Sequence, residues 1–237
     1  GGDDPLRSMD AYAELYLEGI RHVQPKGPYY FLGHSFGSHV AYEITRRLVE
    51  QGETIGRFIV IDTAAPILDH NPINTEVDFP SWVAELGRIA EVMLGRPVHV
   101  DEDYLRSHDE DAQISHLADA MARAGWITLD AKERRIRGLL NVYRSALSIF
   151  YHPTSRLPLE PVLLKAEETE TGTALSDAEM ADPSLRQLLF RTAWGWEELF
   201  SKPVRIRKIP GSHNSIVVEP HVSSLAQVVL EEIGDAP

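Results

Sequence analysis

A pentapeptide of the form Gly-x-Ser-x-Gly, at residues 33–37, is the first feature of the sequence that indicates chemistry. An apolar run rich in aromatic residues precedes it, and residues 38–51 carry apolar side chains at helical spacing. A serine on a tight turn between a strand and a helix, here Ser35, has the geometry of a nucleophile elbow. The amides that begin the helix would face the oxyanion of an acyl-transfer reaction. We expect larger residues at Gly33 or Gly37 to collide with the neighbouring backbone.

An acid and a histidine would complete such a site, and they follow the serine in the order Asp or Glu, then His. Asp62 comes directly after the buried run at residues 57–61, at the carboxyl end of the predicted neighbouring strand. His213 alone of the ten histidines follows a predicted strand and comes after both Ser35 and Asp62. His152, where a long helical segment ends, is the second candidate. We predict that Ser35 is the nucleophile, Asp62 the orienting acid and His213 the general base. Two alternatives stay open: the pentapeptide also occurs by chance, and Asp62 could simply cap a loop.

Composition excludes several other kinds of function. The net charge of −13 argues against a nucleic-acid partner and against docking on an anionic membrane. The chain has no cysteine, which excludes disulfides, a cysteine nucleophile and thiolate zinc sites. The acidic stretch at residues 101–111 predicts a solvated helix surface rather than a metal site. The polar N-terminus does not resemble a signal peptide, and no apolar run approaches the roughly 20 residues of a membrane span. We therefore expect a cytoplasmic protein with no bound metal.

The elements that would position these residues alternate between strands and helices. The first predicted strand ends at His34, and three others cover residues 57–61, 161–166 and 204–209. The predicted helices cover residues 9–22, 38–51 and 222–232. From about 67 to 152 the pattern changes to helical segments at about 79–94, 111–124 and 131–150. We interpret this block as a lid inserted into an α/β core formed by residues 1–66 and 153–237.

Four segments together resemble the thioesterase domains that terminate nonribosomal peptide synthetases and, almost as closely, those of polyketide synthases. They are residues 24–53, 59–66, 161–168 and 209–222. The resemblance implies an α/β-hydrolase fold over residues 1–237, a mostly parallel sheet with flanking helices and a helical lid. It assigns the catalytic triad to Ser35, Asp62 and His213, and one oxyanion-hole donor to the backbone amide of Phe36.

The sequence departs from the family at two places. Many members have Gly-Gly after the elbow serine, where this chain has Gly37 and Ser38. Members also have several strands before the helix at residues 9–22, and we expect those strands in residues that precede the given sequence.

The resemblance implies a thioesterase of natural-product biosynthesis that binds no cofactor of its own. Its substrate would be a peptidyl or acyl thioester delivered on the phosphopantetheine of an upstream carrier domain. Release would be hydrolysis by water or macrocyclisation by the substrate's own amine or hydroxyl, through an acyl-serine intermediate. A stand-alone editing thioesterase or esterase is one alternative, and a catalytically silent module that binds a carrier domain is another.

Overall fold

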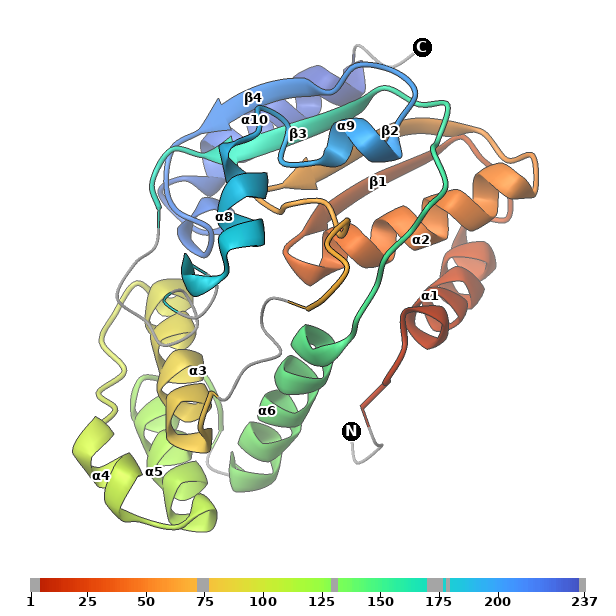
Figure 1. Ribbon diagram of the computed structural model, residues 1–237. Helices are drawn as coiled ribbons and strands as arrows, with labels where there is room; N and C mark the ends of the chain where they lie inside the picture. The colour runs from red at the N-terminus through yellow and green to blue at the C-terminus, as the bar shows by residue number, and fades with distance from the viewer. Residues whose placement is uncertain (1–4, 72–76, 129–131, 170–176, 178–179, 235–237) are drawn as a thin grey trace. The chain divides into compact units, whose positions relative to one another are not determined.

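The computed structural model describes residues 5–71, 77–128, 132–169, 177 and 180–234, which are drawn as ribbon in Figure 1. The chain divides into two compact units. The larger unit comprises residues 7–72, 149–169 and 182–237, and the smaller one comprises residues 1–6, 73–148 and 170–181. None of the helices in the described ranges is both long and apolar enough to cross a membrane.

A parallel sheet of four strands lies at the centre of the larger unit. The strands follow one another across the sheet in chain order: β1 (Tyr29–His34), β2 (Ile55–Ile61), β3 (Pro161–Ala166) and β4 (Arg205–Ile209). His34 pairs with Ile61, so the residues that follow β1 and β2 emerge side by side at the carboxyl edge of the sheet. This is the edge at which parallel α/β sheets place their sites.

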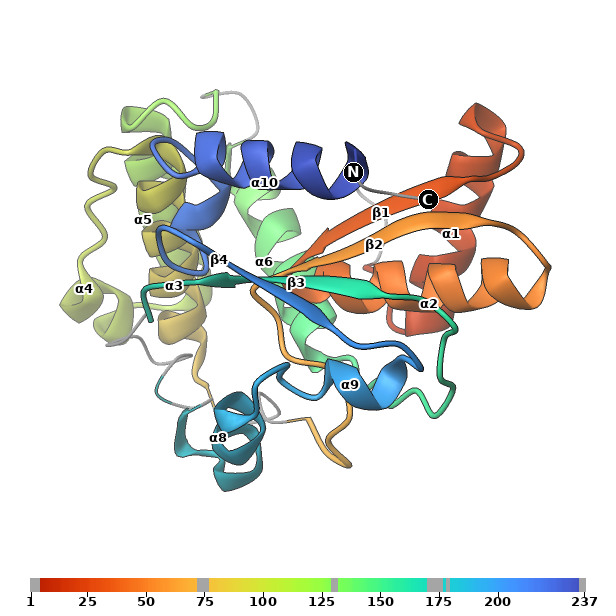
Figure 2. The ribbon, with the colours of Figure 1, turned by 90° about the horizontal axis from the view of Figure 1, so that it is seen from above.

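Helices cover both faces of this sheet, as Figure 2 shows. Alternate side chains of a strand point to opposite faces. Phe58 and Val60 pack with residues of α2 (Phe36–Glu50) and α9 (Trp196–Leu199), whereas Ile59 and Ile61 pack with residues of α10 (Val222–Gly234). Helix α1 packs against α2. The helices of the larger unit are α1 (Met9–Val23), α2 (Phe36–Glu50), α8 (Pro183–Phe190), α9 (Trp196–Leu199) and α10 (Val222–Gly234), with a short 3-10 turn at Ser215–Val217.

A buried carboxylate ties α2 to the segment that returns to the sheet. Glu43 is 3% exposed and accepts hydrogen bonds from Arg46 Nε (2.9 Å), Arg47 Nε (2.6 Å) and the hydroxyl of Tyr151 (2.8 Å). Burial would raise the pKa of Glu43, but the hydrogen bonds outweigh it and hold that pKa at about 2. The carboxylate is therefore charged and fully paired at neutral pH.

The smaller unit is made of helices around its own apolar core. They include α3 (Phe79–Leu94), α4 (Glu102–Ser107), α5 (Glu110–Arg123) and α6 (Lys132–Ser148). Val83, Leu117, Met121 and Ile136 are fully buried in this core. Aspartates at positions 78, 101 and 109 cap α3, α4 and α5, each accepting a hydrogen bond from a backbone N–H in the first turn. The acidic stretch at 101–111 thus serves as helix caps and helix surface.

The element predictions agree closely with the structure where the apolar pattern is long. The helix at 79–94 and the strand at 161–166 have the predicted bounds, and the other predicted elements differ by one or two residues at their ends. Residue 131, the predicted start of α6, lies outside the described residues. The helices α4, α8 and α9 are not predicted from the sequence, because helices of four to eight residues are too short to show a helical period.

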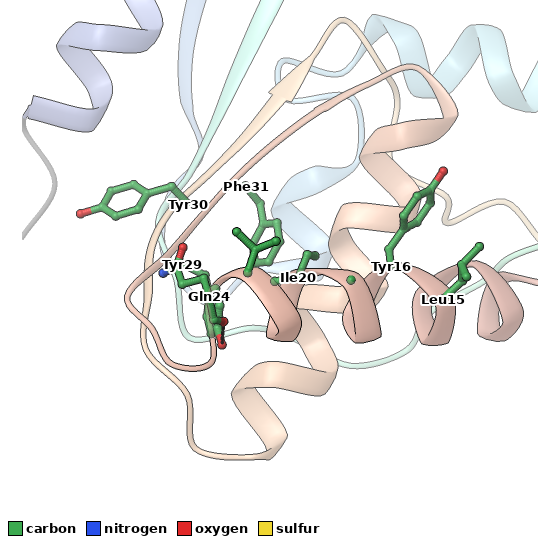
Figure 3. Close-up of a pocket in the computed structure, with 9 residues that line it drawn as sticks. Leu15, Tyr16, Ile20, Gln24, Tyr29, Tyr30 and Phe31 are labelled. Atoms are coloured by element: carbon green, nitrogen blue, oxygen red, sulfur yellow. Dashed lines mark hydrogen bonds between the residues drawn. The ribbon is translucent and has the colours of Figure 1, made fainter.

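A groove between α1 and the first residues of β1 is shown in Figure 3. Leu15, Tyr16 and Ile20 of α1 line it together with Tyr29 and Phe31 of β1. The predicted catalytic residues follow the opposite end of β1 and the ends of β2 and β4, so this groove is not their site.

Candidate active site

Ser35 lies on the turn between β1 and α2, in a strained backbone conformation. Its φ is 53° and its ψ is −137°, a region that few non-glycine residues occupy. The turn folds so tightly that a Cβ added to Gly33 would lie 2.5 Å from the Cα of Ser38. The hydroxyl of Ser38 closes the turn with a hydrogen bond of 2.8 Å to the carbonyl of Gly33. The predicted strand, tight turn and helix are present, and the need for glycine at position 33 is confirmed.

The expectation for the second glycine of the motif is wrong. A Cβ added to Gly37 would meet nothing within 4 Å. The reason is that α2 begins at Phe36, earlier than predicted, so Gly37 already belongs to the first turn of the helix and is exposed. Steric crowding therefore demands glycine only on the strand side of Ser35.

Asp62 follows β2 and is held by the neighbouring strand. Its backbone N–H donates to the carbonyl of Leu164 (2.8 Å), and its Oδ1 accepts from the N–H of Ala166 (2.7 Å). Its side chain is 10% exposed, and its φ is 48°. The hydrogen bond from β3 thus fixes Oδ1 and leaves the second carboxylate oxygen, Oδ2, to contact another residue.

That second oxygen contacts His213, in the loop after β4. His213 Nδ1 lies 3.1 Å from Oδ2 of Asp62 and 3.0 Å from the backbone carbonyl oxygen of the same residue. A carboxylate oxygen and a carbonyl oxygen only accept hydrogen bonds, so Nδ1 carries a proton, and in the neutral ring Nε2 carries the lone pair. His213 is therefore in the tautomer that a general base of a serine hydrolase requires.

Asp62 and His213 are in direct contact. Two further contacts link the end of β1 to the residue that follows Asp62 and to the backbone of His213. The hydroxyl of Thr63 lies 3.4 Å from the carbonyl oxygen of Ser35. The Nε2 of His34 lies 2.8 Å from the carbonyl oxygen of His213.

Two further predicted residues can be located. Phe36 is the first residue of α2, so its backbone N–H is among those that a helix cannot satisfy internally. The second histidine candidate, His152, pairs through Nδ1 with the carbonyl of Leu68 (2.8 Å) rather than with Asp62.

Three residues that sequence reasoning did not assign to the site support the loop that carries Asp62. The indole N–H of Trp196, which is fully buried, donates to the carbonyl of Thr63 (2.7 Å). The carbonyl of Trp194 accepts from the N–H of Ala65 (2.9 Å). His39 Nε2 lies 3.0 Å from the carbonyl of Ala64, and burial lowers the pKa of His39. Trp194, Trp196 and Phe200 lie close together in the sequence, but no local pattern connects them to the loop after β2, and the bond from Trp196 to Thr63 spans 133 positions.

A lysine at the end of β3 lies in the same region. Lys165 Nζ is 4.0 Å from the centre of the Trp194 ring, a cation–π contact. Burial lowers the pKa of Lys165, and the negative charge of Asp62 opposes that shift.

Backbone strain is concentrated around this site. In the described ranges, the non-glycine residues with positive φ are Ser35, Asp62 and Trp194. Such strain persists where the surrounding structure over-determines it, and it clusters at functional sites. As for metals, no group of three or more His, Asp or Glu side chains suited to an ion occurs in the part of the chain that the structure describes.

Comparison with known proteins identifies the family. Residues 1–232 match the family model of the thioesterase domain. Over 237 residues the chain is 51% identical to the non-reducing polyketide synthase crz7 of Cladonia metacorallifera, covering 94% of this chain and 10% of the relative. The chain spans between 6% and 24% of the length of the first curated relatives that it matches.

Solved structures show the same fold. A four-domain nonribosomal peptide synthetase, holo-AB3403, matches all of this chain over 17% of its own, with a TM-score of 0.80 and 23% identity. The Vlm2 thioesterase domain matches 96% of this chain over 77% of its own, with a TM-score of 0.61 and 19% identity. The α/β class, with a parallel sheet and flanking helices, is confirmed, as is the resemblance on which the α/β-hydrolase prediction rested. The chain belongs to the thioesterase domain family, and is thus a member of a family of hydrolases.

Proposed function

We infer that this domain releases a peptidyl or acyl product from a carrier domain by acyl transfer to Ser35. The hydrogen bond from His213 to Asp62, at the same carboxyl edge of the sheet as the strained Ser35, is the observation that carries this inference. The family match supports the reaction class, and the relatives named as polyketide and nonribosomal peptide synthetases support a carrier-bound substrate.

The first half of the reaction forms an acyl-serine. The Nε2 of His213 takes the proton from Ser35 as Oγ attacks the thioester carbonyl. The charge of Asp62 stabilises the imidazolium that results. The Phe36 amide donates to the tetrahedral oxyanion, and a donor of this kind is typically worth about 10²–10³ in rate. The intermediate collapses, and the pantetheine thiol leaves with the proton from His213.

The second half transfers the acyl group to an acceptor that His213 deprotonates. Water as acceptor gives a free acid, and an amine or hydroxyl of the substrate gives a macrocycle. The helical block at about 67–152 is proposed to act as a lid that controls the access of water. One structural relative, the thioesterase domain SrfTE, cyclises the lipopeptide surfactin, so macrocyclisation belongs to the proposal beside hydrolysis.

A binding module without activity is the alternative from another class. The productive tautomer of His213 argues against it, because a module that only binds a carrier domain has no need of a protonated Nδ1 on a buried carboxylate.

Hydrolysis of an acyl-pantetheine thioester tests the proposal. We expect turnover by the wild type, none above background by Ser35→Ala, and unchanged turnover by Ser201→Ala, which alters an exposed serine remote from Asp62 and His213 in the fold. Equal rates for the wild type and Ser35→Ala would refute the assignment of the nucleophile.

A further inference from the structure

The residue between the first glycine and the serine of the motif, His34, contacts the loop of the proposed general base. His34 is the last residue of β1, and its Nε2 lies 2.8 Å from the carbonyl oxygen of His213. The two imidazole rings lie with their centres 4.7 Å apart and their planes inclined by 32°. The contact joins residues 179 positions apart in the chain.

The acceptor settles which nitrogen of His34 carries a proton. A backbone carbonyl oxygen only accepts hydrogen bonds, so Nε2 of His34 must be protonated and must donate. The bond is therefore directional, from the side chain of the elbow to the backbone of the base.

Other hydrogen bonds hold the residues on either side of His213 in the same loop. The N–H of Ser212 donates to Oγ of Ser215 (2.8 Å), and the N–H of Ile216 donates to the carbonyl of Ser212 (2.9 Å). The carbonyl of Gly211 accepts from the N–H of Glu168 (3.0 Å), which fixes the loop to the end of β3. These contacts hold the loop to itself and to β3. The bond from His34 adds a contact to β1, the strand that carries the nucleophile.

We propose that His34 is a positioning residue that sets the distance between His213 and Ser35; the proposal rests on the function proposed above. His34 and Ser35 are consecutive, so a bond from His34 to the backbone of His213 couples the nucleophile elbow to the base. Asp62 selects the tautomer of His213, whereas His34 places its backbone. Proton transfer needs a separation of about 2.6–3.2 Å between the two heavy atoms, and an error of about 1 Å can cost roughly 100-fold in rate.

Two substitutions separate the hydrogen bond from the bulk of the side chain. Glutamine carries an amide N–H donor the same number of bonds from Cβ as Nε2 of histidine, so His34→Gln can keep the bond to His213. His34→Phe keeps a ring of similar size and loses the donor. His22→Phe, at an exposed histidine on α1, is the matched control.

The assays are acyl-pantetheine hydrolysis, for kcat and KM, and the rate at which a fluorophosphonate labels Ser35. We expect His34→Phe to lower both kcat and the labelling rate roughly 10- to 100-fold, with KM little changed. We expect His34→Gln to restore most of both rates, and His22→Phe to behave as the wild type. A purely structural role would not produce this split between kcat and KM or the rescue by glutamine.

The outcomes separate this proposal from the one on which it depends. Labelling of the wild type at Ser35, with an equal rate in His34→Phe, would overturn the role of His34 and leave the nucleophile intact. Absence of labelling in the folded wild type would overturn both. If His34→Phe does not fold, His34→Gln is compared with His34→Asn, whose amide is one carbon too short to reach. Equal rates in those two variants would overturn the proposal, and a slower His34→Asn would support it.

Discussion

Asp62→Asn changes one atom of the carboxylate that contacts the proposed base. In the wild type, Oδ1 accepts from the N–H of Ala166 and Oδ2 lies against Nδ1 of His213. The amide oxygen of asparagine can keep the bond to Ala166, which places its NH₂ group against Nδ1. The substitution therefore removes the negative charge and sets a donor against a donor, while the fold of the loop is retained.

The expected loss is about 10³-fold in kcat. Unit charges about 4 Å apart interact by about 4 kcal/mol at an effective dielectric constant of about 20, which corresponds to roughly 10³ in rate when the imidazolium forms in the transition state. In serine proteases the same change costs about 10⁴, chiefly by favouring the wrong tautomer. Here the carbonyl of Asp62 also lies 3.0 Å from Nδ1 of His213 and can still hold the productive tautomer, so we expect the smaller figure.

The assay is acyl-pantetheine hydrolysis by wild type, Asp62→Asn and Asp10→Asn, the last being an exposed aspartate on α1. Urea denaturation of each variant checks that folding is unaffected. A decrease of less than tenfold in kcat for folded Asp62→Asn would refute the claim that this carboxylate stabilises a charged His213.

Three further predictions concern stability and the support of the site. Gly33→Ala should lower the free energy of unfolding by about 1–3 kcal/mol or more, because its Cβ would overlap backbone. Gly37→Ala, in open space on a helix, should be neutral or stabilising by up to about 1 kcal/mol. Equal losses of stability for Gly33→Ala and Gly37→Ala in urea denaturation would contradict the prediction that only Gly33 is sterically required. Trp196→Phe removes the hydrogen bond to Thr63, and we expect a loss of about 1 kcal/mol or more with a lower kcat; an unchanged kcat would count against support of the acid loop. Glu43→Gln should cost about 3 kcal/mol at pH 7. Since the folded-state pKa of Glu43 is lowered to about 2, the stability that its charge contributes is complete above about pH 4.5 and is lost towards pH 2, so the difference from wild type should shrink over that range. A difference in unfolding free energy between Glu43→Gln and wild type that does not change with pH would contradict this prediction.

The sequence was most informative where a local pattern determines the structure. The nucleophile elbow could be predicted because a strand, a tight turn and a helix are contiguous in the chain, and the crowding at Gly33 arises from residues within that turn. Asp62 and His213 could be nominated because each follows a strand, and parallel strands end at the same edge. Their hydrogen bond could not be derived, since it depends on the path of a loop 151 residues away.

The remaining features depend on contacts between distant segments. Gly37 was misjudged because the sequence does not show where the first turn of α2 begins or which backbone lies beside it. The support of the acid loop by Trp196 and the bond from His34 to His213 each join segments more than 130 residues apart. Apolar spacing reports which face of an element is buried, and it does not report which polar atom meets which across the fold.

Intact-protein mass spectrometry after treatment with a fluorophosphonate shows whether Ser35 is an activated nucleophile. We expect a single adduct on the wild type that maps to Ser35 by peptide analysis and is absent from folded Ser35→Ala. We also expect Asp62→Asn to form the same adduct more slowly, because the base is weakened rather than removed. An adduct that persists in Ser35→Ala, or no adduct on folded wild-type protein, would contradict the assignment of Ser35 as an activated nucleophile.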